Sequence, residues 1–204
     1  MKALCINGSP REDGSTAYLI GKVAEGMRQK NIEVKSYCLG KLNINYCLGC
    51  KKCYKEGICI QKDDMDILIN ELKNADIVVI GTPDYWGDVS GQLKVFFDRN
   101  TPYANTNVNR INMPHPKFGI AISVREGPED FENTNIINSI NHYFGHLEIT
   151  PIAKLALTDT STLEDLLKNQ KEKIDEAYQI GLKVLDLVKT KKKMKILNSL
   201  FIFI

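Results

Sequence analysis

The sequence predicts an α/β domain with a five-stranded, doubly wound parallel sheet in a three-layer α/β/α sandwich. Short apolar, β-branched runs recur five times along the 204 residues, and segments of helical periodicity lie between or after them. Strands that alternate with helices favour right-handed crossovers and hence parallel strands. This length also suffices for one core, since a domain of ~150 residues already buries about 70% of its unfolded surface.

The strands are expected, in chain order, at residues 2–7, 33–39, 76–82, 117–124 and 148–157, where valine, isoleucine and alanine form short continuous runs. The helices are expected at residues 15–30, 63–74, 90–99, 130–147 and 161–189. In each helix, apolar residues recur every three or four positions and form one buried face. The residues that start these faces are Leu19, Met65, Leu93, Ile136 and Leu163.

One domain is expected over residues 1–190, followed by a basic and apolar tail over residues 191–204. The apolar run at residues 197–204 is too short to span a bilayer, which needs ~20 apolar residues. We expect the tail to pack on this domain or on a neighbouring subunit. The alternative is a foot that touches a membrane surface.

The composition is that of an ordinary globular protein, with 43% hydrophobic and 25% charged residues. The net charge of +2 is too small to favour nucleic acid as a partner. The first ten residues lack the ~7–15 residue apolar region of a signal peptide. A cytoplasmic location is therefore expected, and its reducing conditions disfavour disulfides.

Four cysteines lie in one loop, at about residues 40–62, with the spacing C-x2-C-x2-C-x5-C. Thiolates this close in sequence can point at one centre, and compact cysteine runs of this kind hold iron–sulfur clusters. A zinc site is the nearest alternative, although its ligands usually come as two separated pairs. The candidate ligands are Cys47, Cys50, Cys53 and Cys59.

A glycine- and hydroxyl-rich turn connects the first expected strand to the first helix. The hydroxyls of Ser9, Ser15 and Thr16, the charge of Arg11 and the backbone N–H groups of a helix start could all meet one phosphate. The turn matches neither the P-loop nor the dinucleotide-binding motif, so neither an NTPase nor a dinucleotide site is supported. A capped helix start would not need this combination of hydroxyls and arginine.

The turn after the third expected strand holds the single tryptophan beside a tyrosine. Exposed aromatic residues at the ligand edge of an α/β sheet suggest a flat, conjugated partner. Beside a phosphate loop, Pro83, Tyr85, Trp86 and Gly87 therefore favour a flavin mononucleotide. A third turn follows the fourth strand, so four connections are expected to place special residues on one edge of the sheet.

Other ionisable residues receive no catalytic role. His142 and His146 lie four residues apart on one helix face, where most such pairs are surface residues. Asp98 and Arg99 are expected to form a structural ion pair.

These three motifs together resemble the iron–sulfur flavoprotein family, which belongs to the flavodoxin-like NAD(P)H-dependent FMN reductases. The motifs are GSPREDGST, CLGCKKCYKEGIC followed by KDDM, and PDYWGDVSGQLKVFFDR, and the resemblance runs from residue 1 to about residue 128. It implies a flavodoxin-like fold and an FMN-dependent oxidoreductase. It also implies subunits assembled as a homodimer or homotetramer.

The resemblance assigns roles to the residues above. Ser9, Arg11, Ser15 and Thr16 would hold the FMN phosphate, and Pro83, Tyr85, Trp86 and Gly87 would line the isoalloxazine. The four cysteines would ligate a [4Fe-4S] cluster, and Ser123 and Gly127 would add flavin contacts. Electrons would come from NAD(P)H or a ferredoxin-like donor. The alternatives are a reductase without a cluster and a flavodoxin-fold module with structural zinc.

The sequence departs from the family pattern in two places. Arg125 and Glu126 occupy a turn that is commonly richer in glycine, and Asp84 stands where a small apolar residue is usual. A negative charge at Asp84, if close to the flavin, would lower its reduction potential.

Overall fold

The five strands form one parallel sheet with the order β2-β1-β3-β4-β5, as expected. The computed structural model describes the backbone of residues 1–201 and the side chains of residues 1–194. The strands are β1 (Lys2–Asn7), β2 (Glu33–Cys38), β3 (Ile77–Pro83), β4 (Lys117–Val124) and β5 (Ile149–Leu157). Strand order reverses between β1 and β3, and ligands of open α/β sheets bind at such a point, outside the carboxyl ends of the strands.

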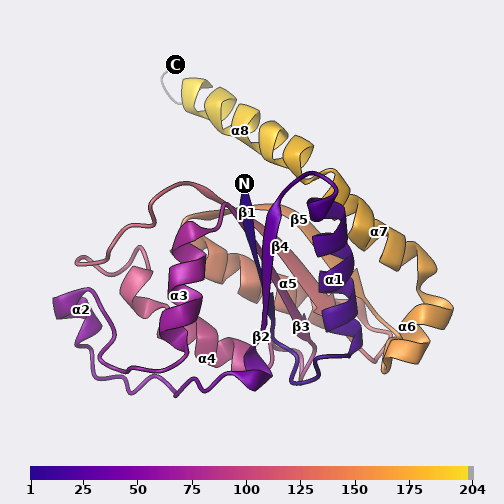
Figure 1. Ribbon diagram of the computed structural model, residues 1–204, viewed down its shortest axis with the longest axis horizontal. Coiled ribbons are helices and arrows are strands. Elements are labelled where there is room, and N and C mark those ends of the chain that lie inside the picture. Colours follow the sequence, from indigo (N-terminus) through magenta and orange to yellow (C-terminus); the bar gives the residue numbers. More distant parts are fainter. Residues whose placement is uncertain (202–204) are drawn as a thin grey trace.

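Helices cover both faces of the sheet and make the expected three-layer sandwich (Figure 1). On one face lie α3 (Met65–Asn74), α4 (Gly91–Arg99) and α5 (Asp130–His146), whose apolar residues share a core with Leu4, Ile6 and Val78. On the other face lie α1 (Ser15–Arg28), α6 (Leu163–Asn169) and α7 (Lys171–Leu182). β4 is buried along its whole length, as a central strand covered on both faces should be.

The single helix expected over residues 161–189 is wrong, because three helices cover this region: α6, α7 and α8 (Val184–Phe201). Gln170 separates α6 from α7, because its backbone, with φ −119° and ψ 37°, is not helical. Its side-chain amide donates a hydrogen bond of 3.1 Å to the carbonyl of Thr158. Gly181 brings α7 against α1, since a Cβ atom there would lie 2.0 Å from the carbonyl oxygen of Val23. A tertiary contact of Gln170, and not a proline, therefore separates α6 from α7.

Helix α8 extends away from the body of the domain (Figure 1) and runs across residue 190 without a break. The docking expected for the tail concerns residues 197–204, whose side chains lie outside the described part of the chain. None of the described helices has the length and apolar composition needed to cross a bilayer.

Candidate functional site

The β1–α1 loop leads into a helix start whose first backbone N–H groups have no side-chain cap. Helix α1 starts at Ser15 after Gly14, with no side-chain cap and no acidic residue in its first turn. The hydroxyl of Ser15 is buried and has no hydrogen-bond partner among the described residues. Because the first N–H groups of a helix have no intrahelical acceptor and favour negative charge, this uncapped start fits a phosphate group.

The predicted phosphate residues surround this helix start. Ser9, Ser15 and Thr16 are buried, whereas Arg11 is exposed at the rim. The hydroxyl of Ser9 accepts a 3.1 Å hydrogen bond from the backbone N–H of Arg11, and the side chain of Asn7 accepts a 2.9 Å bond from the N–H of Ser9. The loop is thus shaped by its own side chains, while the hydroxyl of Ser15 stays available for a ligand.

The connection from β3 to α4 lies at the same edge of the sheet and is hydrogen-bonded to the β1–α1 loop. Ser90 donates a 2.6 Å hydrogen bond to the carbonyl of Gly8 and also caps α4 by accepting from the N–H of Leu93. Gly8 in turn donates a 2.8 Å bond to the carbonyl of Gly81. The carboxyl ends of β1 and β3 are therefore fixed to each other beside the phosphate-type turn.

The predicted aromatic residues stand on a tight hairpin turn in this connection. Tyr85 and Asp88 exchange two backbone hydrogen bonds of 3.0 and 3.3 Å. Trp86 and Gly87 between them have φ values of 60° and 73°, which is the pattern of a type I′ turn. A bulky residue with positive φ is unusual, and here it carries a fully exposed indole. The hairpin thus exposes a flat aromatic surface at this edge of the sheet.

Arg125 and Asp84, the two departures from the family pattern, contact each other. The guanidinium of Arg125 lies 2.5 Å from a carboxylate oxygen of Asp84, and these side chains are only 12% and 5% exposed. Arg125 also pairs with Glu129 and Glu132, and Asp84 accepts a 2.7 Å bond from the N–H of Gly87. The carboxylate of Asp84 is therefore paired within the domain, although one arginine faces three carboxylates and the group keeps a net negative charge. The Asp84–Arg125 pair holds the aromatic hairpin against the β4–α5 turn.

Ser123 and Gly127, the weaker flavin candidates, are placed differently. Ser123 is fully buried at the end of β4, and its hydroxyl donates a 2.6 Å bond to the side-chain oxygen of Asn133 on α5. Gly127 lies in the turn itself, beside the guanidinium of Arg125. The structure brings Gly127 to the edge that carries the hairpin, whereas the hydroxyl of Ser123 is engaged within the domain.

The four cysteines border one small cavity with the end of α4 and Pro102. Three residues with a left-handed backbone conformation let the loop turn around this cavity: Gly49, Lys51 and Gly57 have φ values of 61°, 57° and 73°. Burial raises the pKa of Cys53, and the nearby Cys47, Cys59 and Cys50 raise it further. Among the described side chains, no group of three or more is already arranged as metal ligands. The set of four neighbouring thiols still fits, by donor number and type, a cluster or a zinc ion.

The cysteine cavity lies away from the strand edge, which corrects the expectation that all four connections meet there. Ser90, at the start of α4, contacts the phosphate-type turn, whereas Asp98 and Arg99, at its end, line the cysteine cavity. A helix rises 1.5 Å per residue, so the nine residues of α4 separate the two places by about 13 Å. Figure 1 shows the loop around α2 (Cys53–Glu56) set apart from the strands.

The predicted pairing of Asp98 with Arg99 is wrong, because Arg99 pairs with Asp63. The guanidinium contacts both carboxylate oxygens of Asp63 at 2.6 and 3.1 Å and the carbonyl of Asn45 at 2.8 Å. Asp98 pairs instead with Lys94, one turn earlier on the exposed side of α4. Since Asn45 begins the cysteine loop, the buried pair fixes one end of that loop to α4.

Two asparagines that the sequence analysis missed hold the middle of the cysteine loop. Asn107 donates a 3.0 Å hydrogen bond to the carbonyl of Cys53, and Asn109 donates a 2.5 Å bond to the carbonyl of Tyr54. Both come from the segment between α4 and β4, about 50 residues from the cysteines. Asparagine is common in turns, so only the tertiary contact distinguishes these two from ordinary loop residues.

Comparison with known proteins agrees with this geometry. Residues 1–158 match the family model described as NADPH-dependent FMN reductase. An iron–sulfur flavoprotein of Methanocaldococcus jannaschii is 32% identical, over 95% of this chain and 100% of that protein. Among solved structures, a flavone reductase superposes with a TM-score of 0.71 at 18% identity, covering 94% of this chain and 64% of that one.

A second solved structure, an NAD(P)H:quinone oxidoreductase from Methanothermobacter marburgensis, has a TM-score of 0.68 at 16% identity and covers 90% of this chain and 96% of that one. At such identities these two structures show the flavodoxin-like fold, while the family follows from the sequence matches. The phosphate-type turn, the aromatic hairpin and the four-cysteine loop occur together in a chain that matches both groups. The chain therefore belongs to the NADPH-dependent FMN reductase family, within it to the iron–sulfur flavoproteins, and is a flavin-dependent oxidoreductase.

Proposed function

We propose that the protein passes electrons from NAD(P)H or a ferredoxin-like donor to an acceptor, using FMN at the strand edge and a [4Fe-4S] cluster in the cysteine loop. The observation that carries the proposal is that two separate candidate sites lie at the two ends of one helix, α4. The phosphate-type turn contacts the start of α4, and four thiols border a cavity at its end. A cofactor at each end of α4 would suit transfer between them.

FMN would be held by its phosphate and its ring. Ser9, Arg11, Ser15 and Thr16 would bind the phosphate at the start of α1. Pro83, Tyr85, Trp86 and Gly87, with Gly127 of the adjacent turn, would orient the ring. When bound, FMN supplies hydride and single-electron chemistry, and the protein provides position and electrostatic tuning. The pair of Asp84 and Arg125 would fix the hairpin beside the ring.

Replacing Arg11 or Ser15 by alanine is expected to weaken FMN binding by about 1.5–3 kcal/mol, the range for hydrogen bonds to a charged group. The buried hydroxyl of Ser15 has no partner in the domain, so its loss removes a ligand contact and no internal bond. FMN affinity is measured by fluorescence titration of the apoprotein. Arg28→Ala, at the other end of α1, is the control and should keep the original affinity. Unchanged affinity in both Arg11→Ala and Ser15→Ala would remove this turn from the site.

The cluster would be held by Cys47, Cys50, Cys53 and Cys59. Lysines between the ligands, at positions 51, 52 and 55, would offset the negative charge of a thiolate-bound cluster. The same donors could hold structural zinc, and the fold could act as a FMN or quinone reductase with no cluster. These are the alternatives that metal analysis must separate.

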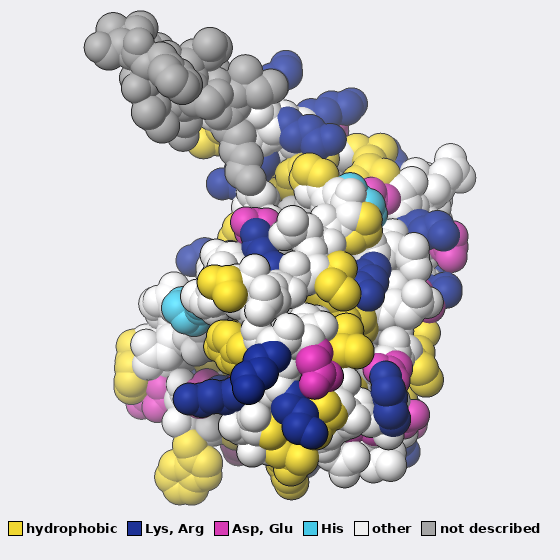
Figure 2. All heavy atoms as spheres, turned by 90° about the vertical axis from the view of Figure 1, so that its left-hand side faces the viewer, with side chains coloured by type: hydrophobic (Ala, Val, Ile, Leu, Met, Phe, Trp, Pro, Cys, Tyr) yellow, Lys and Arg dark blue, Asp and Glu magenta, His cyan; other side chains and the backbone are white. Residues whose placement is uncertain are grey.

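We also propose that subunits associate as a homodimer or homotetramer through the face that carries the cysteine loop. Large apolar side chains lie exposed around the loop: Tyr46, Leu48, Tyr54, Ile58 and Ile60. Figure 2 views the molecule from this side and shows hydrophobic side chains exposed among lysines and arginines. Apolar surface of this kind marks interaction sites on soluble proteins. We further propose a cytoplasmic location, whose reducing conditions would keep the thiols free to bind a cluster.

Anaerobic stopped-flow mixing tests the donor half of the proposal. Mixing with NADPH or NADH should bleach the flavin absorption in a reaction that saturates with nicotinamide concentration. Reduction by a ferredoxin but by neither nicotinamide would retain electron transfer and exclude the nicotinamide donor. Reduction by none of these donors would contradict the proposed function.

A further inference from the structure

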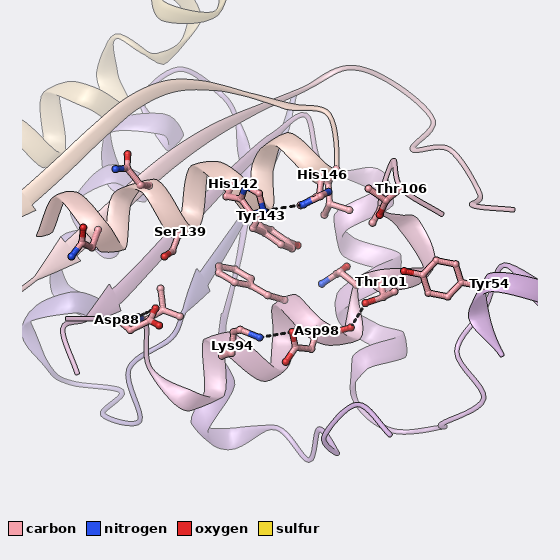
Figure 3. A pocket seen from close by; sticks show the side chains of 17 residues that line it. Tyr54, Asp88, Lys94, Asp98, Thr101, Thr106, Ser139, His142, Tyr143 and His146 are labelled. Carbon is pink, nitrogen blue, oxygen red and sulfur yellow. Dashed lines mark hydrogen bonds and ion pairs between the residues drawn. The ribbon is translucent and has the colours of Figure 1, made fainter. Parts of the chain in front are cut away.

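The part of the chain that the structure describes contains a cavity of about 700 Å³ between α4 and α5. Its volume falls in the range of small-ligand pockets, but it holds none of the residues predicted to bind FMN. The stacked rings of Phe97 and Tyr143 lie among its lining residues. Two histidines of α5, His142 and His146, also line it (Figure 3).

The imidazole rings of His142 and His146 contact each other through their Nε2 atoms. His142 and His146 are one turn apart on α5, so their side chains share a helix face. The distance between the two Nε2 atoms is 3.0 Å, and the ring planes are nearly perpendicular, at 89°. Neither residue takes part in the proposed flavin or cysteine sites.

Asn105 determines the proton arrangement of this pair. Nδ1 of His146 lies 3.0 Å from the side-chain oxygen of Asn105. Because this oxygen is an acceptor only, Nδ1 carries the proton and Nε2 of His146 presents a lone pair. Metal-binding histidines almost always donate the other ring N–H to an oxygen in this way, which fixes tautomer and orientation. Without a metal, the 3.0 Å contact requires Nε2 of His142 to donate a proton to that lone pair. On metal binding His142 can take the same tautomer, because among the described residues its Nδ1 has no hydrogen-bond partner and can hold the proton that Nε2 gives up.

The distance between the Nε2 atoms indicates the coordination geometry that a shared metal ion would have. A metal–nitrogen bond is about 2.0–2.1 Å long, so one ion bound to two nitrogens 3.0 Å apart would subtend an angle of about 94°. This is close to the cis angle of square-planar or octahedral coordination and smaller than a tetrahedral angle. Imidazole nitrogen in tetragonal geometry suits Cu²⁺ and Ni²⁺.

The other coordination positions would be open. No third His, Cys, Asp or Glu side chain completes a metal set among the described residues. Water would fill those positions, or an oxygen of a ligand in the cavity. The nearest lysine in the lining, Lys94, is neutralised by Asp98 at 2.6 Å, so no free ammonium group of the lining opposes a cation.

We propose that His142 and His146 form an open bidentate site for a divalent transition metal, Cu²⁺ or Ni²⁺, positioned by Asn105 at the cavity between α4 and α5. Neither histidine belongs to the cysteine loop, although Tyr54 of that loop lines the same cavity. The bound metal would make the cavity able to bind an oxygen ligand. The histidine pair adds a metal site to the proposed flavin and cysteine sites, and it does not depend on either of them.

Isothermal titration of the untagged, purified protein with NiCl₂ tests this proposal. The wild-type protein should bind one Ni²⁺ without thiolate-to-nickel absorption bands. His142→Asn and His146→Asn should weaken binding more than tenfold, and Asn105→Ala, which keeps both ligands, about tenfold. The third histidine provides the control, because His115 lies outside the cavity lining, and His115→Asn should bind as the wild type does.

Two results would overturn the proposal. The first is unchanged nickel affinity in both His142→Asn and His146→Asn. The second is binding that shows thiolate bands and disappears in Cys47→Ser, since the nickel would then occupy the cysteine loop. Zn²⁺ bound more tightly than Ni²⁺ would contradict the cis geometry.

Discussion

Replacing Arg99 by leucine is expected to lower the free energy of unfolding by about 3–5 kcal/mol, because it leaves the carboxylate of Asp63 buried without its partner. The two side chains are only 1% and 2% exposed. Two guanidinium nitrogens reach Asp63, and one of them also reaches the carbonyl of Asn45. The substitution should also release the start of the cysteine loop and lower its metal content, while FMN stays bound.

Urea denaturation measures the loss, and the neighbouring residue on α4 is a matched control. Asp98 pairs with Lys94 where both side chains are about half exposed, so Asp98→Asn should cost less than about 1 kcal/mol. In the double variant Arg99→Leu, Asp63→Leu, much of the lost stability should return, since no charge remains buried. Equal and small losses in Arg99→Leu and Asp98→Asn would contradict the anchoring role.

The same pair predicts a dependence of stability on acid. Burial raises the pKa of Asp63, but hydrogen bonds from Arg99 and from the N–H groups of Asn45 and Met65 outweigh it and lower the pKa to about 2. The carboxylate therefore stabilises the fold above the unfolded pKa near 3.8, and this stabilisation is lost as the pH falls from there through about 2. A variant with Asp63→Asn should lack this part of the acid dependence.

Replacing any one of Cys47, Cys50, Cys53 or Cys59 by serine is expected to remove most of the iron from the anaerobic protein. A [4Fe-4S] cluster uses four thiolates, and a serine hydroxyl is a poor replacement for one of them. FMN content should remain unchanged, because the phosphate-type turn lies at the other end of α4. Iron, sulfide and flavin are measured on the same anaerobic sample.

Cys38 provides the control for this series. It lies at the end of β2, outside the loop, where its thiol donates to the carbonyl of Ser9 at 3.3 Å. Cys38→Ser can keep that hydrogen bond and should keep the iron. Iron that survives all four substitutions in the loop would place the metal elsewhere.

The fold could be predicted because it rests on local patterns. β1 and β4 begin and end where expected, β2 and β5 differ by one residue at one end, and β3 is shifted by one residue at both ends. A continuous apolar run bounded by polar residues is a strong signal for a buried strand. The break of the last helical region at Gln170 could not be predicted, because a bond to Thr158 of the preceding segment determines it. Helical periodicity contains no information about such contacts.

The candidate site was predictable where residues of one turn act together, and not where distant residues pair. The phosphate-type turn and the cysteine loop are each contiguous in sequence. The partners Arg99 and Asp63 are 36 residues apart, and Asp84 and Arg125 are 41 apart. The sequence alone therefore paired Arg99 with its neighbour Asp98 and left Asp84 unpaired. The distance of the cysteine cavity from the strand edge likewise depends on how the loop follows α4.

Metal and sulfide analysis of the anaerobically purified protein, with its absorption spectrum, tests the central claim most directly. The proposed function predicts about four iron and four sulfide per chain, as a [4Fe-4S] cluster requires, together with noncovalent FMN. Stoichiometric zinc without sulfide would contradict it. The cysteine loop would then be a structural metal site, and hydride transfer from NAD(P)H to FMN would have to account for the whole function.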